Sequence, residues 1–152
     1  MSMERAIFAA AHARLKAPYL WAAKGGWAVR GGARVPVAQL GADWAVDCSG
    51  LVTACILEVG GPDLRATWGS ERMAADLPPP RADESLWLLC YPGHVALGLG
   101  GAAWTIEAAG GDETTLTLDD ARARGACVQI GPATHRVSLL VRSLRALMTA
   151  HP

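Results

Sequence analysis

The longest run of uncharged residues extends from Ser85 to Ile106, where neither Asp, Glu, Lys nor Arg occurs. Such a run is long enough to cross a bilayer, which takes about 20 apolar residues. A spanning helix would have to carry Pro92, Gly93 and further glycines in its interior, at about 1 kcal/mol for each glycine and about 3 kcal/mol for proline relative to alanine. Because Pro-Gly and Gly-Gly favour tight turns between short strands, the pattern predicts an antiparallel meander and no membrane span.

Three strands are expected in this meander: Leu86 to Tyr91, His94 to Leu99 and Ala102 to Ala108. A two-residue turn at Gly100-Gly101 would pair Leu99 with Ala102. The same register would place His94 opposite Glu107. Directly opposed residues of an antiparallel pair project from the same face, so these two side chains would lie within hydrogen-bonding reach.

This register also sorts the hairpin residues into two faces. One face is apolar and contains Val95, Leu97, Leu99, Trp104 and Ile106; the other has His94, Ala96, Gly98, Ala103, Thr105 and Glu107. Because small side chains allow close approach, a helix is expected to pack over Ala96, Gly98 and Ala103 and to bring its N-terminus beside His94. A one-residue slip of the turn would break this arrangement.

Apolar residues at helical spacing predict two longer helices. The first begins after Ser2, a good N-cap, and the second begins after Asp47 and ends at Gly60-Gly61. Shorter elements are a helix from Ser70 to Leu77 with Ser70 as its cap, a helix from Asp119, and a strand from Cys127 to Ile130. Between Arg136 and Met148 the strand and helix patterns overlap, and both remain open.

The length and net charge of the chain limit the number of domains and the kinds of partner that we expect. The chain has 152 residues, which suits one domain over residues 1–152. Its 14 basic and 14 acidic residues give a formal net charge of zero, so no bulk positive field attracts nucleic acid. The apolar run between Arg5 and Arg14 is short and contains His12, unlike a clear secretion signal. We therefore expect synthesis in the cytoplasm, no nucleic-acid partner and no membrane span.

The four cysteines are Cys48, Cys55, Cys90 and Cys127. Cys48 and Cys55 would lie on one helix about 10.5 Å apart along its axis, beyond disulfide reach. A Pro-Gly turn would point Cys90 to the face opposite His94, which weakens the metal-like spacing of these two residues. Cys55, Cys90 and Cys127 are therefore expected to be small buried hydrophobic side chains, with neither a metal nor another cofactor.

Cys48 has a different setting. With Asp47 as N-cap, Cys48 lies in the first helical turn, where free backbone N–H groups and the helix dipole favour a thiolate and lower the thiol pKa. This hypothesis requires the Asp47 carboxylate to cap the backbone rather than face the sulfur. From this segment alone, a nucleophile and a buried core cysteine are equally good interpretations.

A nucleophilic thiol needs a base, and the base needs an orienting partner. His94 and Glu107 supply both if they face each other across the hairpin. The remaining histidines, His12, His135 and His151, lie in less suitable places, and the absence of Asn excludes a Cys-His-Asn arrangement. The expected catalytic set is Cys48, His94 and Glu107.

Three segments occur in a familiar order: Pro18-Tyr19-Leu20-Trp21, Asp47-Cys48-Ser49-Gly50-Leu51-Val52 and Gly93-His94-Val95-Ala96-Leu97-Gly98-Leu99-Gly100. They resemble the NlpC-type cell-wall cysteine peptidases, a papain-like family. The resemblance implies an α+β fold with N-terminal helices packed on a central antiparallel sheet and the catalytic cysteine at a helix N-terminus. It implies Cys48 as nucleophile and His94 as general base, and it places Tyr19, Asp47 and Ser49 around the substrate or oxyanion.

Two positions depart from the family pattern. The third polar residue of the family is usually a histidine, whereas this sequence has Glu107, a carboxylate that can also orient an imidazolium. The glycine pair that usually follows the aromatic segment is replaced by Ala22-Ala23-Lys24-Gly25-Gly26. The loop on the substrate side is therefore open to more than one interpretation.

The function implied by the resemblance is hydrolysis of peptide bonds in bacterial peptidoglycan stems, often between the side-chain carboxyl of D-glutamate and a diamino acid. A compact chain of this kind resembles phage-encoded peptidases, which implies phage tail or virion proteins as partners besides peptidoglycan peptide, and delivery to the cell wall by a phage particle. Two alternatives remain: a related Cys-His amidase or acyl transferase, and a catalytically silent structural tail protein.

Overall fold

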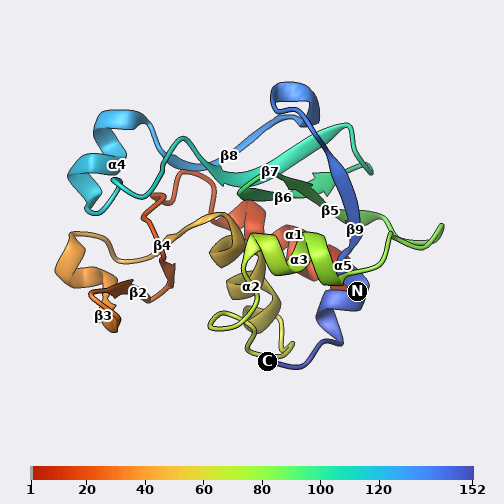
Figure 1. The fold of residues 1–152 in the computed structure, drawn as a ribbon, viewed down its shortest axis with the longest axis horizontal. Coiled ribbons are helices and arrows are strands. Elements are labelled where there is room, and N and C mark those ends of the chain that lie inside the picture. The colour runs from red at the N-terminus through yellow and green to blue at the C-terminus, as the bar shows by residue number, and fades with distance from the viewer. Residues whose placement is uncertain (1) are drawn as a thin grey trace.

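Five strands form one antiparallel sheet in the order β8-β7-β6-β5-β9 (Figure 1). They are β5 (Leu86–Tyr91), β6 (His94–Leu99), β7 (Trp104–Ala109), β8 (Cys127–Pro132) and β9 (Leu140–Ser143). Two small antiparallel pairs lie apart from this sheet: β1 (Lys24–Gly25) with β4 (Ala45–Val46), and β2 (Trp27–Arg30) with β3 (Ala33–Pro36). The structure is a computed structural model that describes residues 2–152.

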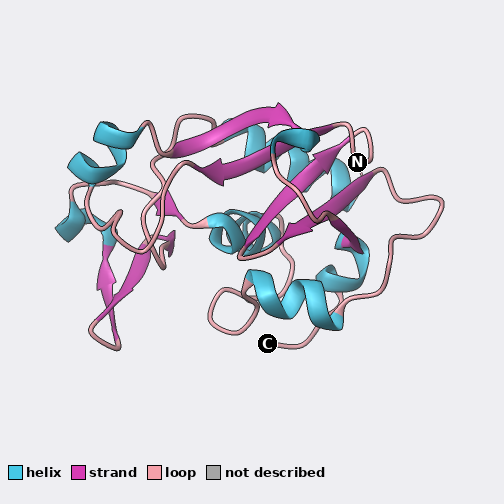
Figure 2. Ribbon diagram, turned by 45° about the horizontal axis from the view of Figure 1, so that its top comes forward, coloured by secondary structure: helices cyan, strands magenta, loops and turns pink. Residues whose placement is uncertain are grey.

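The helices are α1 (Met3–Ala13), α2 (Cys48–Glu58), α3 (Ser70–Asp76), α4 (Leu118–Arg124) and α5 (Leu144–Met148), with short 3-10 turns η1 (Val37–Leu40) and η2 (Ala133–His135). Helices α1, α2 and α3 lie on one side of the sheet in Figure 1. Helix α4 and the β2–β3 hairpin lie together at the left end of the molecule in Figure 1 and Figure 2, away from α1 and α3. The expected α+β arrangement, with N-terminal helices on an antiparallel sheet, is confirmed.

The first hairpin of the meander agrees with the sequence, and the second does not. The Pro92-Gly93 turn pairs Tyr91 with His94 as expected. In the second hairpin Leu99 pairs with Trp104 rather than with Ala102, so the connection has four residues and β7 begins at Trp104. One reason is tertiary, because the carbonyl group of Ala103 accepts a hydrogen bond of 3.1 Å from the backbone N–H of Ala133 instead of entering the hairpin ladder.

The new register means that His94 and Glu107 are not directly opposed. The pairing has shifted by two residues, from Leu99 with Ala102 to Leu99 with Trp104. Because side chains alternate between faces with a period of two, an even shift leaves each side chain on its predicted face. His94 and Glu107 therefore remain on the same face and approach each other diagonally.

Helix α2 packs on the opposite face of the hairpin from the one expected. Its apolar side chains share the main core with the large apolar residues of β6 and β7: Leu51, Val52, Cys55, Val95, Leu97, Ile106 and Ala108. Ala96, on the small-residue face, packs with Leu89, Tyr91 and Ala133 in a separate cluster. The physical reason is that burying large apolar side chains removes more apolar surface from water than close approach over small ones does.

Several smaller expectations are settled by the structure. The segment left open contains both elements, since β9 ends at Ser143 and α5 begins at Leu144. The cap of α3 is Gly69 rather than Ser70. Ser2 caps α1 as expected, and its hydroxyl accepts a 3.3 Å hydrogen bond from the N–H of Arg5. Among residues 2–152, no helix combines the length and the apolar character that crossing a bilayer would require.

Candidate active site

A cleft of about 550 Å³ opens where the N-terminus of α2 meets the start of β6. Five of the six sequence-predicted site residues line it: Tyr19, Asp47, Cys48, Ser49 and His94. His94 reaches the cleft, although α2 packs on the other face of the hairpin, because it is the first residue of its strand. Glu107 is the sixth residue, and it lies buried next to His94.

Cys48 is the first residue of α2, and Asp47 is the N-cap of this helix. Oδ1 of Asp47 accepts a 2.6 Å hydrogen bond from the backbone N–H of Gly50. The carboxylate therefore caps the backbone, which the nucleophile hypothesis requires. As a residue of the first helical turn, Cys48 has a backbone N–H without an acceptor inside the helix.

Lys24 belongs to the same site, and only one feature of the sequence points to this role. Its Nζ lies 2.8 and 2.9 Å from the two carboxylate oxygens of Asp47 and 3.0 Å from Oγ of Ser49. Both side chains of this ion pair are only 13% exposed, so solvent screens it less than a surface pair. The one sequence signal was the segment that replaces the family's glycine pair, because it places a cation there.

The expected lowering of the Cys48 pKa is wrong. Burial raises the pKa of the Cys48 thiol, and the negative charge of Asp47 raises it further. Backbone hydrogen bonding from Val95 and Ser49 and the charge of Lys24 act in the opposite direction without offsetting burial. The helix N-terminus alone therefore does not produce a thiolate, and a base must take the proton.

Tyr19 lies deep in the cleft, with 5% of its surface exposed. The loop after β7 admits the ring because residue 111 is glycine, since a Cβ at this position would overlap the ring atoms. Burial raises the pKa of the Tyr19 hydroxyl, and the neighbouring Cys48 and Asp47 add to this effect. A phenol that keeps its proton can donate a hydrogen bond to an oxyanion.

His94 and Glu107 form the buried end of the site. Nε2 of His94 lies 3.4 Å from Oε1 of Glu107, and the side chains are 6% and 3% exposed. This contact is not aligned as a hydrogen bond, and Nε2 has no other partner among residues 2–152. Because Nε2 is buried against the carboxylate, Nδ1 is the ring nitrogen that remains for the cleft.

The short hydrogen bond of Glu107 is to His135, a residue whose place in the sequence does not predict a role in the site. Nε2 of His135 lies 2.7 Å from Oε1 of Glu107. His135 ends η2, the turn that follows β8, and β8 pairs with β7 so that Glu107 faces Gln129 in the ladder. Only this strand pairing brings His135 to the site, and no local pattern in the sequence could have indicated it.

The carboxylate of Glu107 stays ionised despite its burial. Burial alone would raise the pKa of Glu107, but the surrounding side chains of His94, Thr105 and His135 lower it to about 2. An anion in this position lies against the imidazole ring of His94 and can orient it. The site thus combines a thiol, an imidazole beside an anion, and two groups able to donate hydrogen bonds, the Cys48 N–H and the Tyr19 hydroxyl. Groups of these kinds are the ones that acyl transfer through a thioester uses.

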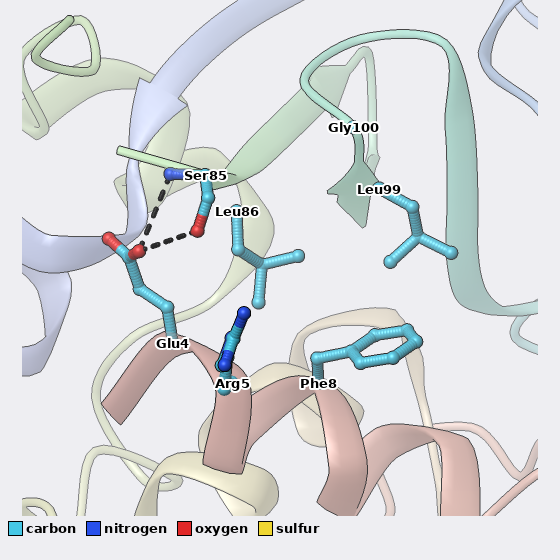
Figure 3. Close-up of a pocket in the computed structure, with 7 residues that line it drawn as sticks. All are labelled: Glu4, Arg5, Phe8, Ser85, Leu86, Leu99 and Gly100. Carbon is cyan, nitrogen blue, oxygen red and sulfur yellow. Dashed lines mark hydrogen bonds between the residues drawn. The ribbon is translucent and has the colours of Figure 1, made fainter. Parts of the chain in front are cut away.

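Other parts of the structure offer less chemistry. A hollow of about 200 Å³ between α1 and the β5–β6 strands contains neither cysteine nor histidine (Figure 3), and its Ser85 hydroxyl donates a 2.8 Å hydrogen bond to Glu4. All four cysteines are free thiols; Cys55 and Cys90 are buried and Cys127 is half-buried. In the part of the chain that the structure describes, no cluster of three or more His, Cys, Asp or Glu side chains is arranged to hold a metal ion.

Comparison with solved structures identifies the fold. The peptidoglycan hydrolase RipB from Mycobacterium tuberculosis matches with a TM-score of 0.59 and 22% identity, over 93% of this chain and 64% of that chain. The NlpC/p60 domain of the peptidoglycan hydrolase SagA matches with a TM-score of 0.55 and 23% identity, over 92% and 97% of the two chains. RipD from Mycobacterium tuberculosis, a non-catalytic NlpC/p60 domain protein, matches with a TM-score of 0.54 and 18% identity, over 93% and 97%.

The protein therefore has the NlpC/p60 fold, and the expected papain-like, NlpC-type architecture is confirmed. No protein-family model matches the sequence, and no curated protein matches it. The chain spans less than two thirds of the length of the RipB structure. At such low identities the similarity establishes the fold, and the chemistry rests on the site.

Proposed function

We propose that the protein is a cysteine peptidase that hydrolyses peptide bonds in bacterial peptidoglycan stem peptides. The observation that carries this proposal is the placement of Cys48, at a helix N-terminus, in one cleft with His94, which is backed by the ionised Glu107. The similarity in fold to the peptidoglycan hydrolases RipB and SagA supports the choice of substrate class.

In the proposed reaction, Nδ1 of His94 takes the proton from Sγ of Cys48, and the thiolate attacks the amide carbonyl carbon. The carbonyl oxygen becomes an oxyanion that accepts hydrogen bonds from the Cys48 N–H and the Tyr19 hydroxyl. The imidazolium then gives its proton to the leaving amine, and a thioester remains. Water, deprotonated by His94, attacks the thioester and releases the carboxylic acid and the thiol.

The bond proposed to be cut joins the side-chain carboxyl of D-glutamate to a diamino acid. Such a substrate has a free carboxylate beside the bond and a free amine or carboxylate on the diamino acid. The cleft offers charges of both signs for these groups, since Arg136, Glu71 and Glu113 line it. Glu71, Glu113 and Arg136 are exposed to solvent and available to a ligand.

Delivery to the cell wall by a phage particle, with phage tail or virion proteins as partners, is part of the same proposal. Its support is the resemblance of this compact sequence to phage-encoded peptidases. In this context the chain is made in the cytoplasm and meets peptidoglycan only after assembly into the particle. Immunoblotting of purified particles against the producing lysate tests this delivery, and absence from the particles would contradict it.

The proposed activity is tested with purified protein, peptidoglycan and synthetic stem peptides, with the products identified by mass spectrometry. The wild-type protein should release a new amine and a new carboxylate at one bond. Cys48→Ala should lower kcat by about 10³-fold or more, because it removes the nucleophile. Cys127→Ala, which changes a half-buried cysteine outside the cleft, is the matched control and should keep full activity.

The outcomes separate the alternatives. Equal cleavage by Cys48→Ala would refute the nucleophile. Transfer of the acyl group to an added amine, without net hydrolysis, would favour an acyl transferase. Failure to turn over any substrate, together with a Cys48 thiol no more reactive than a model thiol, would favour a silent protein, for which the non-catalytic RipD provides a structural parallel.

A further inference from the structure

Two imidazoles share one oxygen of the Glu107 carboxylate. Oε1 lies 2.7 Å from Nε2 of His135 and 3.4 Å from Nε2 of His94. The other oxygen, Oε2, is buried and has no hydrogen-bond partner among the described residues. The short contact with His135 is therefore the interaction best able to fix the orientation of this carboxylate, while the contact with His94 is too long to do so.

His135 is itself held in place from two sides. Its ring packs edge-on against the ring of Tyr91, with 5.8 Å between the centroids. The Tyr91 hydroxyl donates a 2.8 Å hydrogen bond to the carbonyl of Ala133, the first residue of η2. The N–H of Ala133 in turn donates to the carbonyl of Ala103, in the loop between β6 and β7. The turn that carries His135, which follows β8, is thus attached to strand β5 and to the loop between β6 and β7.

His135 does not line the cleft, and about a third of its side chain is exposed. It therefore touches neither the substrate nor the sulfur, and its route to the chemistry passes through Glu107. We propose that His135 is a positioning residue for the reaction of this site: its Nε2–H donates to Oε1 of Glu107 and holds the carboxylate against His94. This inference rests on the proposed function and deepens it.

Three variants test the proposal: His135→Ala, His135→Gln and the matched control Thr134→Ala, which lies in the same turn and is exposed. His135→Ala should lower kcat about tenfold and leave KM within about twofold, because a hydrogen bond to a charged group is lost and no substrate contact changes. His135→Gln should retain most of the activity, because its amide can donate from a similar position. Thr134→Ala should behave as the wild type.

A double-mutant cycle separates positioning from general damage to the fold. If His135 acts only through Glu107, then His135→Ala should have less than about a twofold effect in a Glu107→Gln background. The same loss in both backgrounds would overturn the proposal, and so would a wild-type kcat for His135→Ala. A failure of Gln to restore activity in a protein with wild-type circular dichroism and unfolding midpoint would also overturn it.

The rate at which iodoacetamide alkylates Cys48 gives a readout that needs no substrate. We expect the alkylation rate to fall in His135→Ala and to stay close to that of the wild type in His135→Gln and Thr134→Ala, because this rate reports how well His94 takes the thiol proton. If the wild-type protein cleaves no stem peptide, the proposed function fails while the alkylation rates still decide the role of His135. If cleavage occurs but His135→Ala has the alkylation rate and the kcat of the wild type, only the inference about His135 fails.

Discussion

Glu107 carries a full negative charge with only 3% of its side chain exposed, and its three polar neighbours make this possible. A buried anion without such partners would be neutralised by protonation instead. The thiol of Cys48 behaves differently. Burial raises its pKa and the negative charge of Asp47 raises it further, so the thiolate is disfavoured. Negative charge is therefore favoured on the carboxylate of Glu107 and disfavoured on the sulfur of Cys48.

The lowered pKa of Glu107 predicts how the stability of the protein depends on pH. Its pKa falls from an ordinary 4.5 to about 2, so the ionised side chain contributes stability above about pH 4.5 and loses this contribution as the pH falls toward 2. The full contribution is on the order of 3 kcal/mol. Glu107→Gln should lower the free energy of unfolding near neutral pH and flatten its dependence on pH between these two values.

Urea denaturation at a series of pH values measures this effect. Glu113→Gln is the control, because Glu113 is an exposed carboxylate of the same cleft. The control should follow the wild-type curve throughout. A curve for Glu107→Gln with the wild-type slope would show that Glu107 gains no stability from its neighbours.

Helix α2 is fixed at its N-terminus by close contact with the segment that precedes it. The N–H of Asp47 donates a 2.9 Å hydrogen bond to the carbonyl of Ala23, and β1 pairs Lys24 with Val46. Gly50 faces the same Ala23 carbonyl so closely that a Cβ would overlap its oxygen. The absence of a side chain at position 50 therefore determines how near helix α2, which begins at Cys48, lies to β1.

Gly50→Ala should push α2 away from Ala23 and move Cys48 in the cleft. We expect a loss of about 1–3 kcal/mol in the free energy of unfolding, typical of overpacking in a rigid region. We also expect a fall of at least about tenfold in kcat/KM, because small displacements of reacting groups are costly. Gly26→Ala is the control, since a Cβ there meets no atom within 4 Å. Wild-type activity in Gly50→Ala would refute the role of this contact.

Polar contacts connect the N-terminal helix α1 and the C-terminal helix α5 with the edge of the sheet. Oε1 of Glu84 accepts a 2.7 Å hydrogen bond from the hydroxyl of Ser143, which also caps α5 by accepting from the N–H of Ala146. Arg145 reaches from α5 to Glu4 on α1 at 3.0 Å. Strand β9, at the edge of the sheet, is therefore tied to the start of β5 and to the N-terminal helix.

Glu84→Ala should destabilise the protein without changing the chemistry. Glu84 is 6% exposed and lies outside the cleft, and its removal leaves the buried Ser143 hydroxyl without its acceptor. We expect a loss of about 1–3 kcal/mol in the free energy of unfolding, with kcat unchanged at temperatures where the variant is folded. Asp83→Ala removes an exposed partner of Arg145 and should change the unfolding midpoint very little. A reduced kcat in folded Glu84→Ala would contradict this separation.

Elements with local signals could be predicted from the residue order. The strands Leu86–Tyr91 and His94–Leu99, the Pro92-Gly93 turn and the Asp47 cap all depend on residues within a few positions of one another. The alternation of side chains along β6 and β7 also kept His94 and Glu107 on one face, although the loop between them was longer than expected. Local geometry is robust because it needs only neighbouring atoms.

Contacts between distant segments could not be predicted in this way. The face of the hairpin that α2 covers follows from the total apolar surface that packing buries, and the raised pKa of Cys48 follows from that burial. Lys24 and His135 lie 23 and 28 positions from the carboxylates they bind, so only the pairing of β1 with β4 and of β7 with β8 brings them there. The sequence by itself therefore identifies candidate residues of the site, while the tertiary structure determines which of them are charged and which residues they contact.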